Sequence, residues 1–411
     1  MHKAKMKGGA PMKTLLINAK LLTFDPTPAF REGELLMENG IVLDVAAPGL
    51  LSRDEVEVID AAGALVSPGL VDIHSHGRAG GDFVTADVER LQRMSRSYLE
   101  AGVTTVMPTL ASAPYGEFGT AADRLASAAS AHAGARLIGL HLEGRYLNPA
   151  KRGAHAPALL APLDADELAQ LTKRMCRPYV EAQLACPLRV SAALELDADG
   201  SFSRKAKELG IRLSLGHTAA TYEEATLAIE RGALSLTHLY NTMPPLHHRA
   251  GGPVMACFDA AKQGKEIYGE LICDGLHISP EMIRLAYAML GVNHTVLISD
   301  SMEGTSCPDG DFSIAGQHVT LKDGRAYTDD GALAGSTLNL IDGVRHLMAF
   351  TGASAAEALT CATRNPARAA GLDSLVGSFK KGCFADFLLL SDDLAIRGVY
   401  VGGVLQGGCT L

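Results

Sequence analysis

Two histidines separated by one residue end an apolar segment that follows a Pro-Gly turn. The segment reads Pro68-Gly69-Leu70-Val71-Asp72-Ile73-His74-Ser75-His76-Gly77. Because successive side chains of a strand point to opposite faces, His74 and His76 would share one face. Imidazole is a common ligand of zinc and related metals, so this pair could bind one ion. Two ordinary histidines would give the same local pattern, so the neighbouring strands must decide between these interpretations.

The middle of the chain alternates between strand-like and helix-like segments. The strand-like segments are 70–76, 103–107, 136–142, 188–193, 212–216, 233–238, 268–273 and 295–299, and helical patterns at 86–101, 116–132, 164–185, 221–231 and 280–290 lie between most of them. Eight strands alternating with helices predict an α/β fold, a (β/α)8 TIM-like barrel. A doubly wound open sheet is the structural alternative, but no Gly-x-Gly-x-x-Gly signature follows the first strand.

The two ends of the chain both consist of short strand-like segments. Asn39-Gly40 lies between two of them and is typical of a two-residue hairpin turn. We therefore expect both termini to build one small β-sandwich domain, from residues 1–67 plus 380–411, with the barrel spanning 68–379. Residues 1–11 are basic and lack the apolar core of a signal peptide, so we interpret them as a flexible extension.

Polar residues follow the apolar part of almost every predicted barrel strand. They are His74, His76, Glu143, Glu195, His217, His238, Asp274, His277 and Asp300. The chemistry of barrel enzymes gathers at the C-terminal ends of the strands. We predict that Glu143, His217 and His238 bind one divalent metal. His74 and His76 are available for a second ion, with Glu143 or Asp300 shared between the two. Nitrogen and oxygen ligands without cysteine favour a catalytic zinc or iron site that keeps a position open for water.

Composition excludes several other classes of protein. The net charge of −9 and the absence of a basic stripe argue against a nucleic-acid partner. No apolar run approaches the roughly 18 residues that a membrane span needs. The eight cysteines are scattered without Cys-x-x-Cys spacing, which is typical of free thiols in a reducing compartment. We therefore expect a cytoplasmic protein.

Several motifs together resemble a known family. The opening His-x-His segment looks like the start of an amidohydrolase superfamily sequence, and later motifs are similar to the N-acetylglucosamine-6-phosphate deacetylase family within it. These motifs are His141-Leu142-Glu143-Gly144, Lys151-Arg152-Gly153-Ala154-His155, Gly216-His217-Thr218, Thr237-His238-Leu239-Tyr240-Asn241-Thr242-Met243, Asp274-Gly275-Leu276-His277, Ile298-Ser299-Asp300, Ala334-Gly335-Ser336 and Asn365-Pro366-Ala367-Arg368. The Thr-His-Leu-Tyr-Asn and Asp-Gly-Leu-His runs are the specific ones.

The resemblance implies a hydrolase of linear amides that removes the acetyl group from an N-acetylhexosamine 6-phosphate, with N-acetylglucosamine 6-phosphate as the expected substrate. It implies one or two divalent ions per subunit, zinc before iron or another transition metal. Asp300 is expected to take a proton from the attacking water and pass it to the leaving amine. Its alternative role is that of a plain metal ligand, and the two roles can coexist.

The resemblance also implies roles for residues outside the strand ends. His155 would stabilise the oxyanion of the tetrahedral intermediate, and its alternative is an exposed loop histidine. His277 and Arg249 resemble phosphate-binding residues, and arginine suits phosphate because its planar fork donates two bonds at once. The Arg249 position of the family reaches the neighbouring subunit, which implies a homodimer; the alternative is a surface charge. The remaining sugar contacts would come from Asn241, Thr242, Ala334 and Gly335.

Three departures from the family pattern keep some questions open. Arg145 stands where proline is usual and predicts an extra cation near the pocket, and His247 and His248 replace small or polar residues. The chain keeps the first His-x-His pair, which some members lack, so the number of ions is open. The rival substrates are N-acetylgalactosamine 6-phosphate and the amides of other amidohydrolases. A non-catalytic barrel that serves as an interaction module is the rival from a different class, and it would be expected to have lost its ligands.

Overall fold

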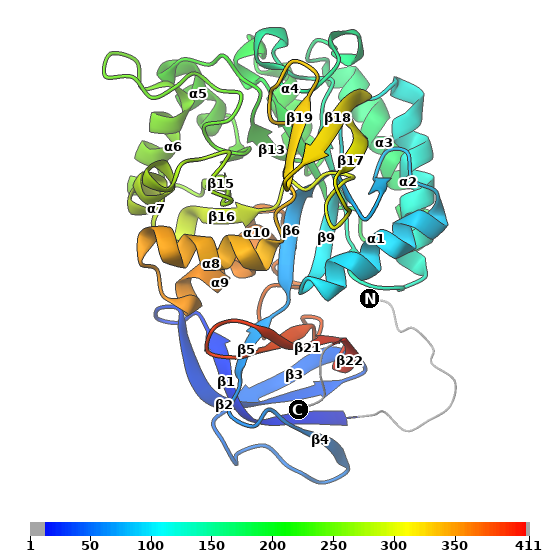
Figure 1. Ribbon diagram of the computed structural model, residues 1–411, viewed down its shortest axis with the longest axis vertical. Coiled ribbons are helices and arrows are strands. Elements are labelled where there is room, and N and C mark those ends of the chain that lie inside the picture. Colours follow the sequence, from blue (N-terminus) through cyan, green and yellow to red (C-terminus); the bar gives the residue numbers. More distant parts are fainter. Residues whose placement is uncertain (1–12, 408–411) are drawn as a thin grey trace.

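The structure is a computed structural model that describes residues 13–407. The extension expected at residues 1–11 lies outside the described residues. The chain forms a barrel surrounded by helices, and a smaller layer of strands lies against one end of it (Figure 1). The expected fold class is confirmed, because eight parallel strands with intervening helices make the barrel and strands from both chain ends make the smaller layer.

Strands from the two chain ends belong to one sheet of mixed direction. Its members are β1 (Lys13–Thr23), β2 (Ala29–Glu38), β3 (Ile41–Ala46), β4 (Val56–Asp60), β5 (Leu65–Pro68), β20 (Phe387–Leu390), β21 (Ile396–Val401) and β22 (Val404–Gly407). Strand β5 joins the two ends, because it pairs with β1 on one side and with β20 on the other. The predicted hairpin turn connects β2 to β3, and both Asn39 and Gly40 have the positive φ that this turn requires.

The barrel strands lie close to the predicted segments. They are β6 (Leu70–Ser75), β9 (Val103–Leu110), β11 (Leu140–Glu143), β12 (Leu188–Ala192), β13 (Arg212–Leu215), β14 (Ala233–Leu236), β15 (Tyr268–Ile272) and β16 (Thr295–Ile298). Every residue of β6, β9, β11, β12, β15 and β16 is buried. Side chains that leave the C-terminal ends of these strands therefore converge on one small region.

Two backbone hydrogen bonds close the barrel between its first and last strands. The N–H of Asp300 donates to the carbonyl oxygen of His74 at 2.9 Å, and the N–H of His76 donates to the carbonyl oxygen of Ser301 at 2.8 Å. This closure is short, but it fixes Asp300 directly beside the His-x-His pair.

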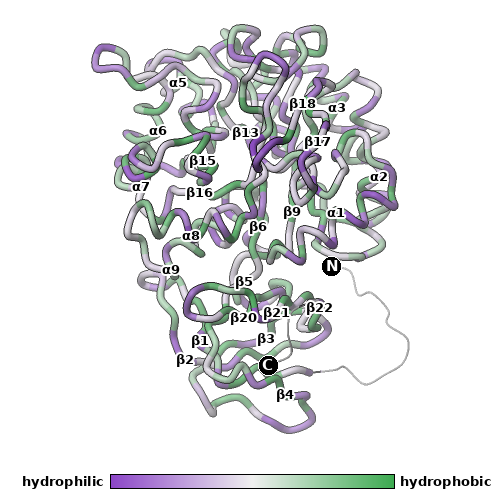
Figure 2. The backbone as a smooth tube through the Cα atoms, in the orientation of Figure 1, coloured by the Kyte–Doolittle hydropathy of each residue, from purple (hydrophilic) through white to green (hydrophobic). Residues whose placement is uncertain are grey.

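Helices cover the outside of the barrel. They are α1 (Val88–Glu100), α2 (Tyr115–Ser130), α3 (Ala165–Glu181), α4 (Ser201–Glu208), α5 (Tyr222–Glu230), α6 (Gly252–Lys262), α7 (Pro280–His294), α8 (Leu340–Thr351), α9 (Ala355–Ala362) and α10 (Arg364–Ala369). Helix α5 begins with the expected capping box, in which Thr221 and Glu224 each accept a hydrogen bond from the other's backbone N–H. In Figure 2, much of β15 and β16 has the green colour of hydrophobic residues. Along α1 and α2, green hydrophobic segments alternate with purple hydrophilic ones. Within residues 13–407, no helix is both long and apolar enough to cross a membrane.

Two features differ from the sequence-based expectation. The predicted strand at 136–142 is divided into β10 (Arg136–Leu137) and β11, because Gly139 adopts a φ of 71° where a Cβ would lie 2.4 Å from the carbonyl oxygen of Pro187. A three-stranded antiparallel sheet was not predicted at all. Its strands are β17 (Gly310–Ile314), β18 (Gln317–Lys322) and β19 (Arg325–Thr328), and in Figure 1 it is the yellow hairpin layer in front of the barrel.

Candidate active site

Six buried side chains from five different strand ends surround one small space. They are His74, His76, Glu143, His217, His238 and Asp300. Each lies at or within two residues of the C-terminal end of β6, β11, β13, β14 or β16. Their donor atoms form two groups, each held within 4.8 Å, that could bind a metal: His74 with His76 and Asp300, and Glu143 with His217 and His238.

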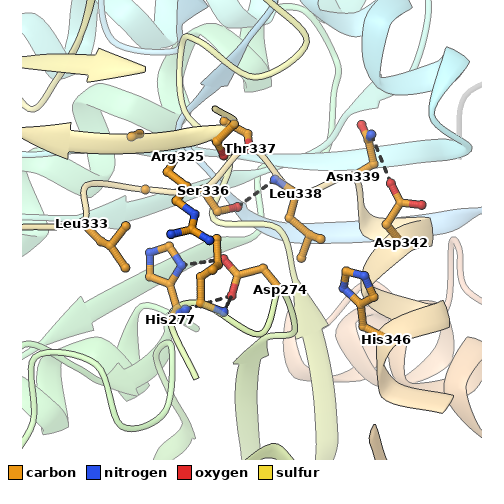
Figure 3. A pocket seen from close by; sticks show the side chains of 14 residues that line it. Asp274, His277, Arg325, Leu333, Ser336, Thr337, Leu338, Asn339, Asp342 and His346 are labelled. Carbon is orange, nitrogen blue, oxygen red and sulfur yellow. Dashed lines mark hydrogen bonds and ion pairs between the residues drawn. The ribbon is translucent and has the colours of Figure 1, made fainter. Parts of the chain in front are cut away.

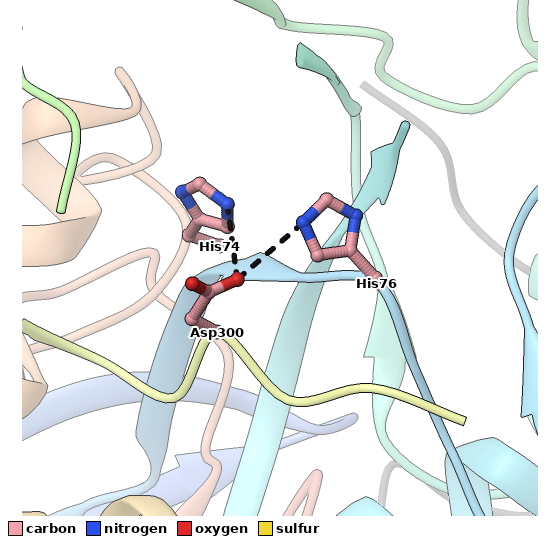
Figure 4. Close-up of side chains that lie close together, drawn as sticks. All are labelled: His74, His76 and Asp300. Carbon is pink, nitrogen blue, oxygen red and sulfur yellow. Dashed lines mark ion pairs between the residues drawn. The ribbon is translucent and has the colours of Figure 1, made fainter. Parts of the chain in front are cut away.

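The first group, which we call the His74 set, consists of His74, His76 and Asp300 (Figure 4). The Nε2 atoms of both histidines lie 3.4 Å from Oδ1 of Asp300. Glu143 also reaches this group, because its Oε2 lies 2.9 Å from Nε2 of His76 and 3.3 Å from Nε2 of His74. The sequence had left open whether Glu143 or Asp300 is shared, and in this geometry the carboxylate that faces both groups is Glu143.

The second group, which we call the His217 set, consists of Glu143, His217 and His238. The other oxygen of Glu143, Oε1, lies 3.0 Å from Nε2 of His238 and 3.3 Å from Nε2 of His217. The two imidazole Nε2 atoms are only 3.1 Å apart. One carboxylate therefore separates two sets of nitrogen atoms and turns one oxygen toward each.

The donor atoms of the His217 set fit a bound cation. Nδ1 of His217 lies 2.9 Å from the carbonyl oxygen of Lys151, so Nδ1 carries the ring hydrogen and Nε2 presents a lone pair. That lone pair faces Oε1 of Glu143, and two facing lone pairs repel unless a cation or a proton lies between them. Nδ1 of His238 is buried and has no hydrogen-bond partner within the described residues. Histidine and carboxylate ligands of this kind suit zinc or iron.

Three of these residues adopt an unusual backbone conformation. His217, His238 and Asp300 have φ values of 47°, 30° and 48°, in the left-handed region that side chains other than glycine rarely adopt. Each such residue typically costs about 1–3 kcal/mol, and such residues cluster at functional sites. Each of the three residues comes two positions after the end of its strand, and its left-handed conformation turns the chain so that the side chain points over the end of the barrel.

A proton would compete with a metal ion for the His74 set. Burial alone would lower the pKa of His76, but its hydrogen bonds to Asp300 and Glu143 outweigh burial and raise the pKa to about 9. The same two carboxylates also raise the pKa of His74 against the effect of its burial. In the His217 set, burial outweighs the attraction of Glu143 at His238 and holds the pKa of that ring below its usual value.

We expect the metal affinity of the His74 set to increase with pH up to about pH 9. His76 holds a proton below that pH, and a metal must displace it, so the apparent affinity should fall about tenfold for each pH unit below 9. A competition titration against a chromophoric chelator at several pH values between 6 and 9 measures this. His76→Gln is the matched control, because it removes the ring whose pKa is about 9 and should leave a weaker pH dependence, in which the raised pKa of His74 still contributes. Equal pH dependence in both proteins would contradict the prediction.

His155 lies beside the two sets, on the loop between the short helices η1 (Pro149–Lys151) and η2 (Pro157–Leu159). It is buried, with its Nε2 3.8 Å from Oε2 of Glu143, so the alternative of an exposed loop histidine is wrong. Its Nδ1 lies 2.9 Å from the hydroxyl of Ser112. Burial lowers the pKa of His155 to about 3, so the ring is neutral at physiological pH.

A cavity of about 270 Å³ lies beside the end of β15. Figure 3 shows Asp274, His277 and Arg325 on one side of it and residues of α8 on the other. Oδ2 of Asp274 accepts a hydrogen bond of 2.7 Å from Nδ1 of His277. Burial alone would lower the pKa of His277, but Asp274 outweighs it and the pKa is raised. Gly335, one of the predicted sugar contacts, also lines this cavity, and Ala334 precedes it in a buried position.

The remaining predicted residues lie on the loop that follows β14. Asn241 and Thr242 are half-buried beside His238, and the Nδ2 of Asn241 donates to the carbonyl oxygen of His238 at 3.1 Å. Arg249 lies farther along this loop and is exposed. Within the described residues, its guanidinium makes no hydrogen bond or ion pair and does not reach the two sets. The loop therefore carries Arg249 on the surface of the subunit.

The extra cation expected from Arg145 is neutralised. Its guanidinium forms two hydrogen bonds to the carboxylate of Glu167 on α3, at 3.1 and 3.0 Å, and it also lies over the ring of Tyr115. Glu195, which the sequence left between a pocket residue and an exposed strand end, ties two loops together. It accepts hydrogen bonds from Asn148 and from Thr218 next to His217.

Sequence reasoning missed a pair of charged residues inside the barrel. Arg189 on β12 and Glu270 on β15 are fully buried and form an ion pair below the two sets. Oε2 of Glu270 also lies 3.7 Å from Nδ1 of His74. Both charged residues lie within strands that the sequence predicts to be buried. A charge at such a position needs a buried partner, and this is the sequence signal that could have revealed the pair.

Comparison with known proteins shows the family of this chain. A sequence profile of the Amidohydrolase family matches residues 65–405. The chain is 34% identical to N-acetylgalactosamine-6-phosphate deacetylase of Escherichia coli O157:H7 over 92% of this chain and 99% of that one. It is 33% identical to N-acetylglucosamine-6-phosphate deacetylase of Vibrio furnissii over 82% of each chain. Its fold matches a solved structure of a mutant N-acetyl-D-glucosamine-6-phosphate deacetylase from Mycobacterium smegmatis in complex with N-acetyl-D-glucosamine-6-phosphate. The TM-score is 0.82 at 28% identity, over 97% of this chain and 99% of that one.

Proposed function

Since the chain belongs to the amidohydrolase family of metal-dependent hydrolases, we propose that it removes the acetyl group from an N-acetylhexosamine 6-phosphate. N-acetylglucosamine 6-phosphate is the proposed substrate, with glucosamine 6-phosphate and acetate as products. The observation that carries the proposal is the shared carboxylate of Glu143 between two imidazole sets, with His277 lining a cavity at the neighbouring strand end. The relatives named as deacetylases of this substrate class support it.

The proposed ligands are Glu143, His217 and His238 for one ion, and His74 and His76 with Glu143 for a second. The chemistry that a divalent cation would supply there is Lewis-acid activation, which would make a bound water acidic enough to lose a proton near neutral pH. Zinc is the proposed metal, and two ions per subunit agree with two complete sets of donor atoms.

Asp300 has the chemistry of a general base and acid. Burial would raise its pKa, but His74 and His76 lower it below the usual range, so the carboxylate is ionised at neutral pH. It accepts the proton of the attacking water and then delivers it to the leaving amine of the sugar. His155 faces the same space from the opposite loop and donates to the carbonyl oxygen as negative charge develops on it.

His277 and Arg249 are the proposed phosphate ligands, and Asp274 raises the pKa of His277, which favours the charged form of its ring. Asn241, Thr242, Ala334 and Gly335 are the proposed contacts of the sugar. Arg249 extends from the surface of its own subunit, so it would reach the phosphate bound by a second copy of this chain in a homodimer.

We expect Arg249→Ala to raise KM for the 6-phosphorylated substrate at least tenfold while leaving kcat within about twofold, because one charge-assisted contact to phosphate is lost. Steady-state kinetics with phosphorylated and unphosphorylated N-acetylglucosamine measure this. Arg204→Ala is a matched control, since Arg204 on α4 is another exposed arginine, and its guanidinium donates to the backbone oxygen of Asp199 away from the two sets. An equal rise in KM for both sugars would mean that Arg249 does not bind phosphate.

Acetate release from a panel of N-acetylhexosamines tests the proposed function directly. The panel contains the gluco and galacto isomers, each with and without the 6-phosphate. Turnover of only the phosphorylated sugars supports the proposal, and the ratio of kcat/KM between the two isomers decides between them. Turnover of an unrelated amide alone would assign another amidohydrolase activity. A purified protein without stoichiometric metal and without turnover would favour the non-catalytic interaction module.

The cytoplasmic location stays a prediction. It agrees with the cysteines, because the seven cysteines among the described residues are all free.

A further inference from the structure

Ser112 follows the end of β9 and lies next to the loop that carries His155. It is the second residue after the end of β9, it is buried, and no role has been given to it above. Three polar contacts meet at this residue. Its hydroxyl lies 2.9 Å from Nδ1 of His155, its own N–H donates to the same Nδ1 at 3.4 Å, and its hydroxyl oxygen accepts the N–H of Arg145 at 3.2 Å.

These contacts determine which ring nitrogen of His155 carries the hydrogen. A backbone N–H can only donate, so Nδ1 of His155 accepts from Ser112 and bears no hydrogen. The hydroxyl contact agrees, because one lone pair of Ser112 Oγ is occupied by the N–H of Arg145 and its hydrogen is free to point to Nδ1. The single ring hydrogen is then on Nε2, the atom that faces Glu143 and the two metal-binding sets.

We propose that Ser112 is a positioning residue that fixes His155 in its Nε2–H tautomer and thereby makes it a hydrogen-bond donor toward the substrate carbonyl. The opposite tautomer would present a lone pair to the developing oxyanion and repel it. This inference rests on the proposed function, because it assigns the cause of one role within the proposed reaction.

The backbone around Ser112 is packed to hold this arrangement. Gly144 follows Glu143 directly, and a Cβ at that position would lie 2.5 Å from both the backbone nitrogen and the hydroxyl of Ser112. Only glycine permits so close an approach, and this approach brings the N–H of Arg145 onto the serine hydroxyl. The strand end that carries Glu143 and the group that orients His155 are therefore coupled through one turn.

The tautomer can be observed without turnover. In the zinc-loaded protein labelled with ¹⁵N-histidine, the resonances of His155 can be assigned by their loss in His155→Gln. The proposal expects a bare Nδ1 and a protonated Nε2 in the unmodified protein. In Ser112→Ala it expects a measurable share of the Nδ1–H tautomer, because only the longer backbone contact of 3.4 Å remains after the 2.9 Å hydroxyl contact is removed. A protonated Nδ1 in the unmodified protein, or an unchanged tautomer in Ser112→Ala, would overturn it.

Steady-state kinetics provide a second, independent measurement. Removal of a whole oxyanion donor typically costs about 10²–10³ in rate, and Ser112→Ala keeps the backbone N–H, so we expect kcat to fall about tenfold with KM within about twofold. Ser112→Thr retains the hydroxyl and should restore most of kcat. Ser95→Ala is the matched control, because it removes another buried serine hydroxyl, on α1, that donates to a backbone oxygen at 2.9 Å.

The two ways of failing can be told apart. If no N-acetylhexosamine 6-phosphate is hydrolysed by the unmodified protein, the proposed function fails, but the tautomer of His155 is still measured. If deacetylation occurs and Ser112→Ala matches Ser95→Ala in kcat, the role of Ser112 fails and the proposed function stands. If Ser112→Ala does not fold, the ring hydrogen in the unmodified protein and kcat of Ser112→Thr still decide the proposal.

Discussion

Asp300→Asn should reduce kcat for deacetylation by about 10³-fold or more while at least one metal ion per subunit stays bound. The amide has the shape of the carboxylate but cannot take a proton from water or return it to the amine, and such proton transfer contributes about 10²–10⁴ in rate. The His217 set does not include Asp300, so an ion held there is retained. Acetate release and metal content by elemental analysis, measured on the same preparation, test both halves of the prediction.

Asp274→Asn is the matched control for this experiment. Asp274 also follows a barrel strand and is largely buried, but it belongs to neither metal-binding set and instead binds His277. Its substitution should affect KM for the phosphorylated sugar more than kcat. Normal turnover by Asp300→Asn would remove the acid–base role and leave Asp300 as a plain metal ligand. Loss of all metal would mean that the two sets do not bind independently.

Glu143→Gln should remove both ions and reduce deacetylation to background. One oxygen of Glu143 faces the His74 set and the other faces the His217 set, so an amide in its place leaves each set with a weaker, uncharged donor or with an N–H group. The metal should also stabilise the folded protein, by about 4 kcal/mol when its free concentration is a thousand times the dissociation constant. Chelation should therefore lower the Tm of the unmodified protein and leave the Tm of the variant almost unchanged.

His141→Gln is the control on the same strand. His141 precedes Glu143 by two residues and is buried. Its ring packs edge-on against His74, but its ring nitrogens bind Thr109 and Ser191 and neither nitrogen belongs to a metal-binding set. It should keep its metal and its response to chelation. A Glu143→Gln protein that retains two ions per subunit would show that Glu143 is not the shared ligand, and Asp300 would then be the candidate for that position.

The types and order of the site residues could be predicted from the sequence. Side chains along a strand alternate between two faces, and a buried strand can be recognised as a short apolar run. A His, Glu or Asp that directly follows such a run therefore lies at the C-terminal end of the barrel. Strands β6, β12 and β16 agree with their predicted segments within one residue at each end. The β17–β19 sheet was missed because it follows the last barrel strand and lies outside the repeating barrel pattern, although β18 alternates between exposed and buried positions.

The arrangement of atoms around these residues required the tertiary structure. Arg145 appeared as a free cation in the sequence, and only the packing of α3 shows that Glu167 neutralises it. Arg189 and Glu270 are separated by 81 residues, and their pairing depends on which strands lie opposite each other across the barrel. Arg249 is exposed on a loop, and the role proposed for it requires a second subunit, which no local sequence pattern reveals.

The sequence by itself therefore determined the barrel, the family and the residues available as metal ligands, because these depend on the local period and on residue type. Only the tertiary structure decided that Glu143 faces both sets, that Asp300 is hydrogen-bonded beside His74, and that Ser112 directs the ring of His155. Each of these contacts joins residues that are far apart in the chain, so no local sequence pattern specifies it. Residue type specifies which chemistry is available, and the closed barrel fixes the direction in which each atom acts.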